Sequence, residues 1–392
     1  MINIFIYLSG FFPILASLIV AEILVSKYDL ETYGLLTFSI AFNKIFSCLA
    51  SIPIHENSIK TFRTTNIGSY QIELSNTFGL IILPFIAGFF YIEDKYLLLG
   101  ICILSVFSFY TSCFEELVTA SSHKLIFAFH KFISFLALII CCAYLIFYRP
   151  SNPIFFIIMS IVIEMGFFII FVFYKLRTKL FFSFDINNLL MIMKDKQGKL
   201  HYLNKLGKVS TQNIDNFILG NLSSLDILAQ YELLKKICAP INMLTNSIYF
   251  VFNRTLIEDR KLHMIRLKKI ILLVTLMVTS VAFLYSLFIV QVSNFLMLNI
   301  VEILNKNFEL FFVLLSAFTL RAFLWWPRYI SVYIDAKHSV LTSFFTSLII
   351  VAGFFAVSDL NKLDFYVYIY FSAYLISYGF WQSKLYFGNF NR

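Results

Sequence analysis

The segment KLRTKLFFSFDINNLLMIMKDKQGKLHYLNKLGK, Lys175–Lys208, interrupts a chain that is otherwise almost continuously apolar. It carries eight Lys or Arg residues and lies close to the midpoint of the 392 residues. On either side of it about six apolar runs follow one another, each close to the ~20 residues that a helix needs to cross the hydrocarbon core of a bilayer. The pattern predicts two groups of six membrane-spanning helices joined by one basic connector.

The composition supports this interpretation and excludes a soluble globular domain. Hydrophobic residues make up 60% of the chain, charged residues only 14%, and the mean hydropathy is +0.82. We therefore predict an all-α integral membrane protein of about twelve spans, with an N-terminal bundle at 1–174, a connector at 175–206 and a C-terminal bundle at 207–392. The spans are expected near 4–25, 33–54, 72–92, 96–118, 125–148, 153–174, 207–228, 237–256, 270–292, 308–334, 339–357 and 365–386.

The distribution of Lys and Arg predicts the orientation. With the N-terminus inside, the cytoplasmic connections collect twenty Lys or Arg residues and the external ones seven, among them Lys235 and Lys236. Positive residues are enriched in cytoplasmic loops, so both termini are expected in the cytoplasm. The net charge of +9 then reflects topology and requires no nucleic-acid partner.

Polar residues recur at helical spacing inside several expected spans. Such residues either form hydrogen bonds between helices or face a polar lumen. Their presence on several different helices favours a shared lumen, lined by Ser47, Ser112, Asn242, Asn246 and Asn253.

Charged residues within the spans are the candidates for function. Lys44, Arg321 and Arg328 are cations, and an arginine fork suits a phosphate group. The acids Glu164 and Asp215 either pair with Lys44 or Arg321 as buried salt bridges or couple transport to an ion. His130 and Lys131, at the cytoplasmic edge of the fifth span, either meet a phosphate or extend to the membrane surface, and the second alternative is favoured.

The chain resembles the Wzx-type polysaccharide flippases of the MOP superfamily, which also includes the MATE exporters. The resemblance lies in Tyr33-Gly34-Leu35-Leu36, in the run from Ile214 to Gly220, and in Ala229-Gln230-Tyr231, Lys235-Lys236 and Pro240. It implies two six-helix bundles around a central cavity and a role for Lys44 and Arg321 in a cationic lumen.

The resemblance also implies a function. Flippases of this family move an undecaprenyl-pyrophosphate-linked oligosaccharide, such as an O-antigen repeat unit of lipopolysaccharide, across the bacterial cytoplasmic (inner) membrane. Alternating access, driven by an ion gradient, is the expected mechanism. The expected partners are this lipid-linked oligosaccharide, the bilayer, and polysaccharide polymerase and chain-length proteins.

The sequence shows no metal or cofactor motif, and no enzyme activity is expected. Two alternatives remain: a membrane-embedded polysaccharide polymerase and a MATE-like exporter of small molecules. A polymerase is disfavoured because the expected external connections are short and contain no histidine. An exporter of organic cations is disfavoured because the deep charges Lys44 and Arg321 are basic.

Overall fold

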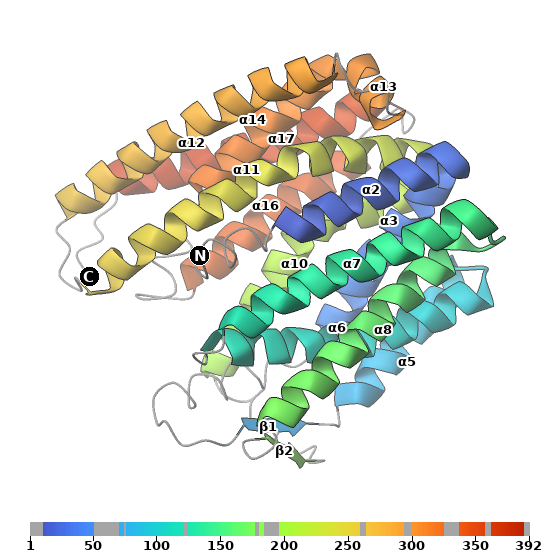
Figure 1. Ribbon diagram of the computed structural model, residues 1–392. Coiled ribbons are helices and arrows are strands. Elements are labelled where there is room, and N and C mark those ends of the chain that lie inside the picture. The colour runs from blue at the N-terminus through green and yellow to red at the C-terminus, as the bar shows by residue number, and fades with distance from the viewer. Residues whose placement is uncertain are drawn as a thin grey trace. The chain divides into compact units, whose positions relative to one another are not determined.

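The computed structural model is helical apart from one pair of short strands, and thirteen helices lie in the part of the chain that it describes (Figure 1). The described residues are 11–50, 70–73, 76–120, 124–176, 180–183, 196–258, 264–293, 299–324, 337–356 and 362–387. The chain forms two compact units, Met1–Phe217 and Ile218–Arg392. The boundaries expected from the sequence at 174 and 206 remain predictions.

The first unit is a bundle of long apolar helices. Helix α6 packs against α5 and α8, and α7 packs against α2 and α8 (Figure 1). The buried residues of these helices are mostly Leu, Ile, Phe, Ala and Cys. The elements of the unit are α2 (Phe11–Lys27), α3 (Leu30–Ala50), α5 (Asn76–Tyr91), α6 (Lys95–Ala120), α7 (Lys124–Tyr148), α8 (Pro153–Leu176) and α10 (Lys196–Leu222), which continues across the unit boundary.

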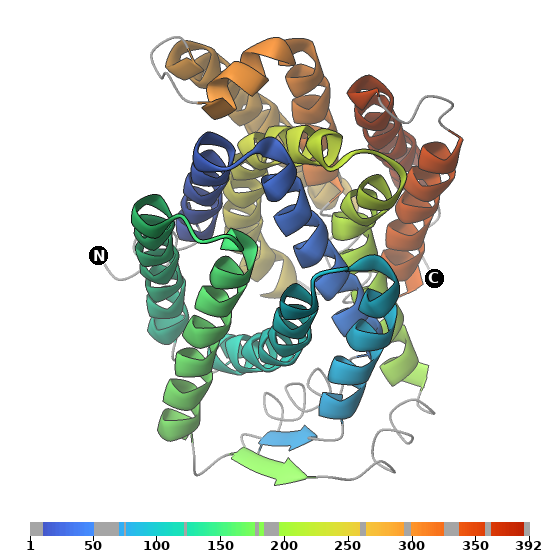
Figure 2. The same ribbon diagram turned by 90° about the vertical axis from the view of Figure 1, so that its right-hand side faces the viewer.

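Two short strands tie the segment after α3 to the segment after α8. Strand β1 (Tyr70–Glu73) pairs in parallel with β2 (Leu180–Ser183), so that Tyr70 lies opposite Leu180 (Figure 2). The basic connector therefore contains a strand, which the sequence pattern did not indicate.

The hairpin of α7 and α8 is closed by a short turn at residues 149–152. Arg149 adopts the left-handed conformation there, with φ of 42°. Asn152 caps α8, since its Oδ1 accepts the backbone N–H of Phe155 at 3.2 Å. Its Nδ2 also donates to Asp94 Oδ2, and Asp94 Oδ1 accepts the N–H of Tyr96 at 2.8 Å at the start of α6. One side-chain contact thus joins the beginnings of α6 and α8.

The second unit is built around α11. Helices α12, α14 and α17 all pack against it, and α16 packs against α17. The short helix α13 meets α14 at an angle of 89°, and its apolar side chains Ile300 and Leu304 are buried. The elements are α11 (Leu225–Glu258), α12 (Met264–Ser293), α13 (Asn299–Lys306), α14 (Phe308–Phe323), α16 (Lys337–Phe355) and α17 (Leu363–Phe387).

Several helices have the length and apolarity of membrane spans. Within the described residues, four single helices meet these requirements, and the bent pair α13–α14 adds a fifth span if it is counted as one. Large apolar side chains also cover the outer faces, with Phe147 81% exposed and Phe90 77% exposed. The chain is a multi-pass membrane protein, while twelve spans in two bundles around a cavity remain a prediction.

The seventh span was expected at 207–228, and its predicted C-terminal boundary is wrong. Helix α10 ends at Leu222, and α11 begins at Leu225, where Ser224 Oγ accepts the backbone N–H of Ile227 at 3.4 Å. Serine side chains form such local hydrogen bonds with the backbone and therefore favour helix ends. A span predicted from the hydropathy of a segment does not take this preference into account. Since α11 begins so early, Lys235 and Lys236 lie inside this helix and not in an external connection.

Candidate functional site

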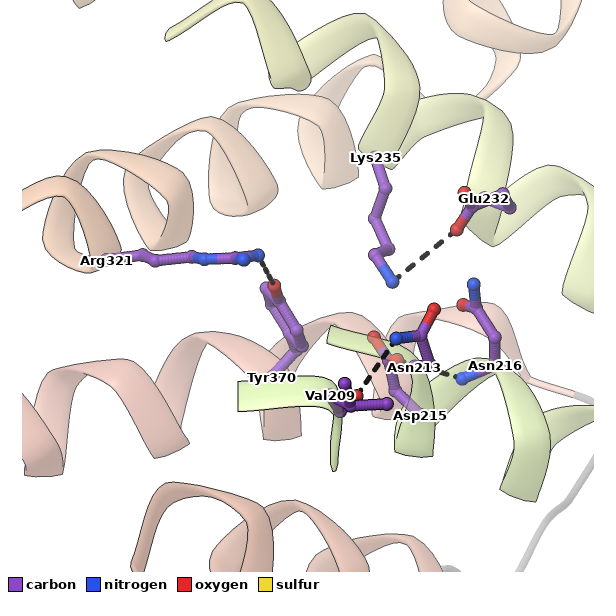
Figure 3. A network of polar contacts seen from close by, with 8 residues as sticks. All are labelled: Val209, Asn213, Asp215, Asn216, Glu232, Lys235, Arg321 and Tyr370. Carbon is purple, nitrogen blue, oxygen red and sulfur yellow. Dashed lines mark hydrogen bonds and ion pairs between the residues drawn. The ribbon is translucent and has the colours of Figure 1, made fainter. Parts of the chain in front are cut away.

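Lys235 lies in the core of the second unit. Its neighbours on α11, Leu233, Leu234 and Ile237, are buried, and the Lys235 side chain is only 7% exposed. Lys235 Nζ lies 3.5 Å from Glu232 Oε2, one helical turn earlier (Figure 3). It also lies 5.0 Å from the centroid of the Tyr231 ring and 5.6 Å from that of Tyr370. These distances are those of cation–π contacts, which are strongest where water is excluded.

Arg321 approaches Tyr370 from another helix. It lies in the last turn of α14, and its guanidinium Nη1 donates to the Tyr370 hydroxyl at 3.2 Å (Figure 3). The guanidinium carbon lies 5.7 Å from the Phe318 ring and 6.0 Å from the Tyr374 ring. Tyr370 is therefore shared by two cations, with Lys235 over its ring and Arg321 at its hydroxyl.

The tyrosines that surround these cations are buried. Tyr231, Tyr370 and Tyr374 are each at most 1% exposed, and the rings of Tyr370 and Tyr374 lie 4.9 Å apart on α17. The Tyr374 hydroxyl has no hydrogen-bond partner among the described residues. A buried hydroxyl without a partner costs free energy unless a ligand satisfies it.

We call this group the Tyr370 cluster: Tyr231, Glu232, Lys235, Arg321, Tyr370 and Tyr374. The cluster contains two cations, Lys235 and Arg321, and one carboxylate, Glu232. Its cations, its low exposure and its aromatic surfaces suit an anionic ligand that also carries flat or ring-shaped groups.

A second buried polar group lies in the first unit. His130 of α7 and Glu164 of α8 are 5% and 4% exposed, and His130 Nδ1 lies 2.6 Å from Glu164 Oε1. The His130 ring also stacks on Phe168 at 3.8 Å between centroids. The favoured expectation that His130 reaches the membrane surface is wrong, because the neighbouring carboxylate holds it in the core.

The alternative in which Glu164 pairs with Lys44 or Arg321 finds no support in the described contacts, where its partner is His130. Sequence spacing alone cannot show such a pair, because it depends on how α7 and α8 are rotated about their axes.

Asp215 is fully buried on α10, close to the buried Asn213 and Asn216. The backbone N–H of Asn216 donates to Asp215 Oδ1 at 2.9 Å, and Asn213 Nδ2 donates to the Val209 carbonyl at 2.9 Å (Figure 3). The roles of Asp215 and Glu164 in ion coupling remain predictions. No group of three potential metal-ligating side chains occurs among the residues that the structure describes.

Among the remaining predicted site residues, Ser47 Oγ donates to the Lys44 backbone carbonyl at 3.4 Å within α3. Lys44 is exposed, and Ser47, Ser112 and Lys131 are partly exposed. Arg328 lies outside the described residues, as do the side chains of Asn242, Asn246 and Asn253. Their functional roles stay predictions.

The sequence analysis missed Lys235, Tyr231 and Tyr370 as site residues. Lys235 was assigned to an external connection because it lies between the expected spans 207–228 and 237–256. The available signal was the spacing Tyr366, Tyr370, Tyr374 on α17, which places three tyrosines on one helix face.

Comparison with known proteins identifies the fold. No protein-family model and no curated protein matches the chain. Among solved structures, an inward-facing multidrug resistance MATE family transporter of the MOP superfamily matches with a TM-score of 0.56 and 13% identity, over 97% of this chain and 93% of the other.

Two further MATE structures are also similar. A MATE in complex with Br-NRF matches with a TM-score of 0.51 and 12% identity, over 97% of this chain and 95% of the other. A MATE in the bent conformation matches with a TM-score of 0.50 and 11% identity, over 98% and 94%. The chain therefore has the fold of these MATE transporters.

Proposed function

We propose that this protein is a flippase that moves an undecaprenyl-pyrophosphate-linked oligosaccharide across the bacterial cytoplasmic membrane. The observation that carries the proposal is the Tyr370 cluster, in which Lys235 and Arg321 share one buried tyrosine. A pyrophosphate is a compact anion, and charge-assisted hydrogen bonds from Lys and Arg are the strongest that a protein offers it.

The aromatic part of the cluster suits the sugars that follow the pyrophosphate. Apolar faces of sugar rings pack on aromatic rings, and the Tyr374 hydroxyl can donate a hydrogen bond to a substrate oxygen. The prenyl chain remains in the bilayer, so only the polar head group crosses. Alternating access then exposes the head-group site to each side in turn, and Glu164 or Asp215 couples the motion to an ion.

Replacement of the cations tests the proposal. We expect Arg321→Ala and Lys235→Ala each to lower surface glycan at least about tenfold in a strain lacking the native gene, since a hydrogen bond to a charged group contributes ~1.5–3 kcal/mol. Lipid-linked oligosaccharide should accumulate in the inner leaflet while the protein stays in the membrane. Lys44→Ala should also reduce export if Lys44 lines the substrate path.

Lys306→Ala is the matched control. Lys306 is a cation of the same unit, its side chain is 70% exposed, and its described partner is Glu302, which is not a member of the cluster. Normal surface glycan in both the Arg321 and the Lys235 variants would contradict the flippase proposal.

A MATE-like exporter of organic cations is the second candidate. The Glu232 carboxylate and the Tyr231 ring favour it, because both lie within contact distance of the same buried cation, Lys235, and tyrosine rings and acids together bind cations. The two functions predict opposite results for Glu232→Gln. An exporter should lose resistance to cationic dyes in this variant, whereas a flippase should retain most of its glycan export.

A further inference from the structure

A groove lies between the first half of α7 and the second half of α8, at the end of the hairpin opposite to its turn. Its volume is about 620 Å³, within the ~300–1,000 Å³ typical of small-ligand sites. Its walls are apolar and largely aromatic, with Ile126, Phe129 and Ile133 from α7 and Phe167, Phe168 and Phe171 from α8.

We expect the walls of the groove to face the bilayer. Both helices contain segments long and apolar enough to cross a membrane, and Phe129 and Phe167 are 52% and 68% exposed. Side chains with such exposure at this depth contact hydrocarbon. An occupant of the groove is therefore an apolar chain that enters from the lipid and not a solute from water.

The floor of the groove is the His130–Glu164 pair. The two side chains face each other, and Phe168 covers the His130 ring, so that the surface left to an occupant is apolar. A hydrocarbon chain seated here also keeps water from the pair, which strengthens the attraction between the two groups when they are charged.

We propose that the α7–α8 groove binds part of the polyisoprenyl chain of the lipid-linked substrate. This inference rests on the proposed flippase function, which requires such a chain to stay at hydrocarbon depth while its head group crosses. The lining residues Ile126 to Ile133 extend over ~11 Å of helix, so the groove holds a few isoprene units. The planar double bonds of these units stack on the phenylalanine rings, whereas a saturated acyl chain has no such planar groups.

The test measures binding of undecaprenol, which has the chain but no phosphate and so reports on the groove alone. Purified full-length protein is titrated with undecaprenol and, separately, with phosphatidylglycerol, and the bound lipid is counted by native mass spectrometry. Ile133→Trp fills the groove and should weaken undecaprenol binding about tenfold, which corresponds to ~1.4 kcal/mol. Phe167→Leu, which removes one aromatic wall without filling the groove, should weaken undecaprenol binding more than phosphatidylglycerol binding.

Ile140→Trp is the matched control, because Ile140 lies two turns further along the same face of α7, is 70% exposed and does not line the groove. Equal undecaprenol binding by the Ile133 and Ile140 variants would overturn the groove assignment. If Ile133→Trp and Phe167→Leu each weaken phosphatidylglycerol binding as much as undecaprenol binding, the groove is a general lipid site. That result would overturn the assignment to a polyisoprenyl chain.

Measurements of glycan export distinguish a failure of the groove assignment from a failure of the proposed flippase function. If Arg321→Ala abolishes export while Ile133→Trp changes neither export nor undecaprenol binding, the groove assignment fails and the flippase function stands. If Arg321→Ala and Lys235→Ala both export normally, the flippase function fails whatever the groove binds.

Discussion

His130 and Lys235 show how single titratable residues are accommodated in the core of this membrane protein. Each is less than 10% exposed, and each lies beside both a carboxylate and an aromatic ring. An unpaired charge in such an environment is costly, and a pair is tolerated only if both partners are present. The pairs are therefore sensitive points of stability as well as candidates for function.

A double-mutant cycle on the His130–Glu164 pair tests this at the residue scale. Glu164→Leu and His130→Leu should each lower the free energy of unfolding by ~1–3 kcal/mol, because each leaves the other polar side chain buried without its partner. The double variant His130→Leu/Glu164→Leu should lose less than the sum of the two single variants, since neither polar group remains. Unfolding in bicelles measures all three values, and additive losses would show that the two side chains do not interact.

Side-chain contacts at helix ends join the starts of α6 and α8 in the first unit. Asp94 and Asn152 each cap a helix and also contact each other, so the starts of α6 and α8 are held side by side. The caps satisfy backbone N–H groups that have no partner within a helix. Such a contact positions two helices that are distant in sequence without requiring any loop residue to be rigid.

Asp94→Ala should destabilise the first unit by ~1–2 kcal/mol, because it removes the cap of α6 and the partner of Asn152. The measurement is again unfolding in bicelles. Glu93→Ala is the matched control, since Glu93 is an exposed acid next to Asp94 and makes no described cap contact. Equal losses in the two variants would show that the cap does not contribute.

For the whole molecule, the chain combines a MATE-like fold with a buried lysine, Lys235, in its second unit. The transport proposal also requires a defined orientation in the membrane. The excess of Lys and Arg in every second connection predicts that orientation.

Reporter fusions test the orientation. Fusions after Leu190 and after Leu262 should both report a cytoplasmic location, because six and eight expected spans precede them. A fusion after Ser151, in the turn between α7 and α8, should report the external side. A cytoplasmic signal at Ser151, or an external one at either other position, would contradict the predicted topology.

The sequence by itself determined most of the helices. The expected spans 125–148 and 153–174 correspond to α7 at Lys124–Tyr148 and α8 at Pro153–Leu176. Such agreement arises because a long apolar run in lipid must satisfy its own backbone hydrogen bonds, and a helix does so locally. Where a local capping signal stood within an apolar run, as at Ser223–Ser224, the expected boundary was wrong.

Only the tertiary structure decided which polar residues meet. Arg321 was predicted from its depth in a span, but its contact with Tyr370 and the contact of Lys235 with the same tyrosine depend on three helices that are far apart in sequence. The same holds for His130 and Glu164. Apolarity along a segment sets where a helix forms, whereas the rotation of each helix against its neighbours sets the partners of its side chains, and that rotation is fixed by packing across the whole unit.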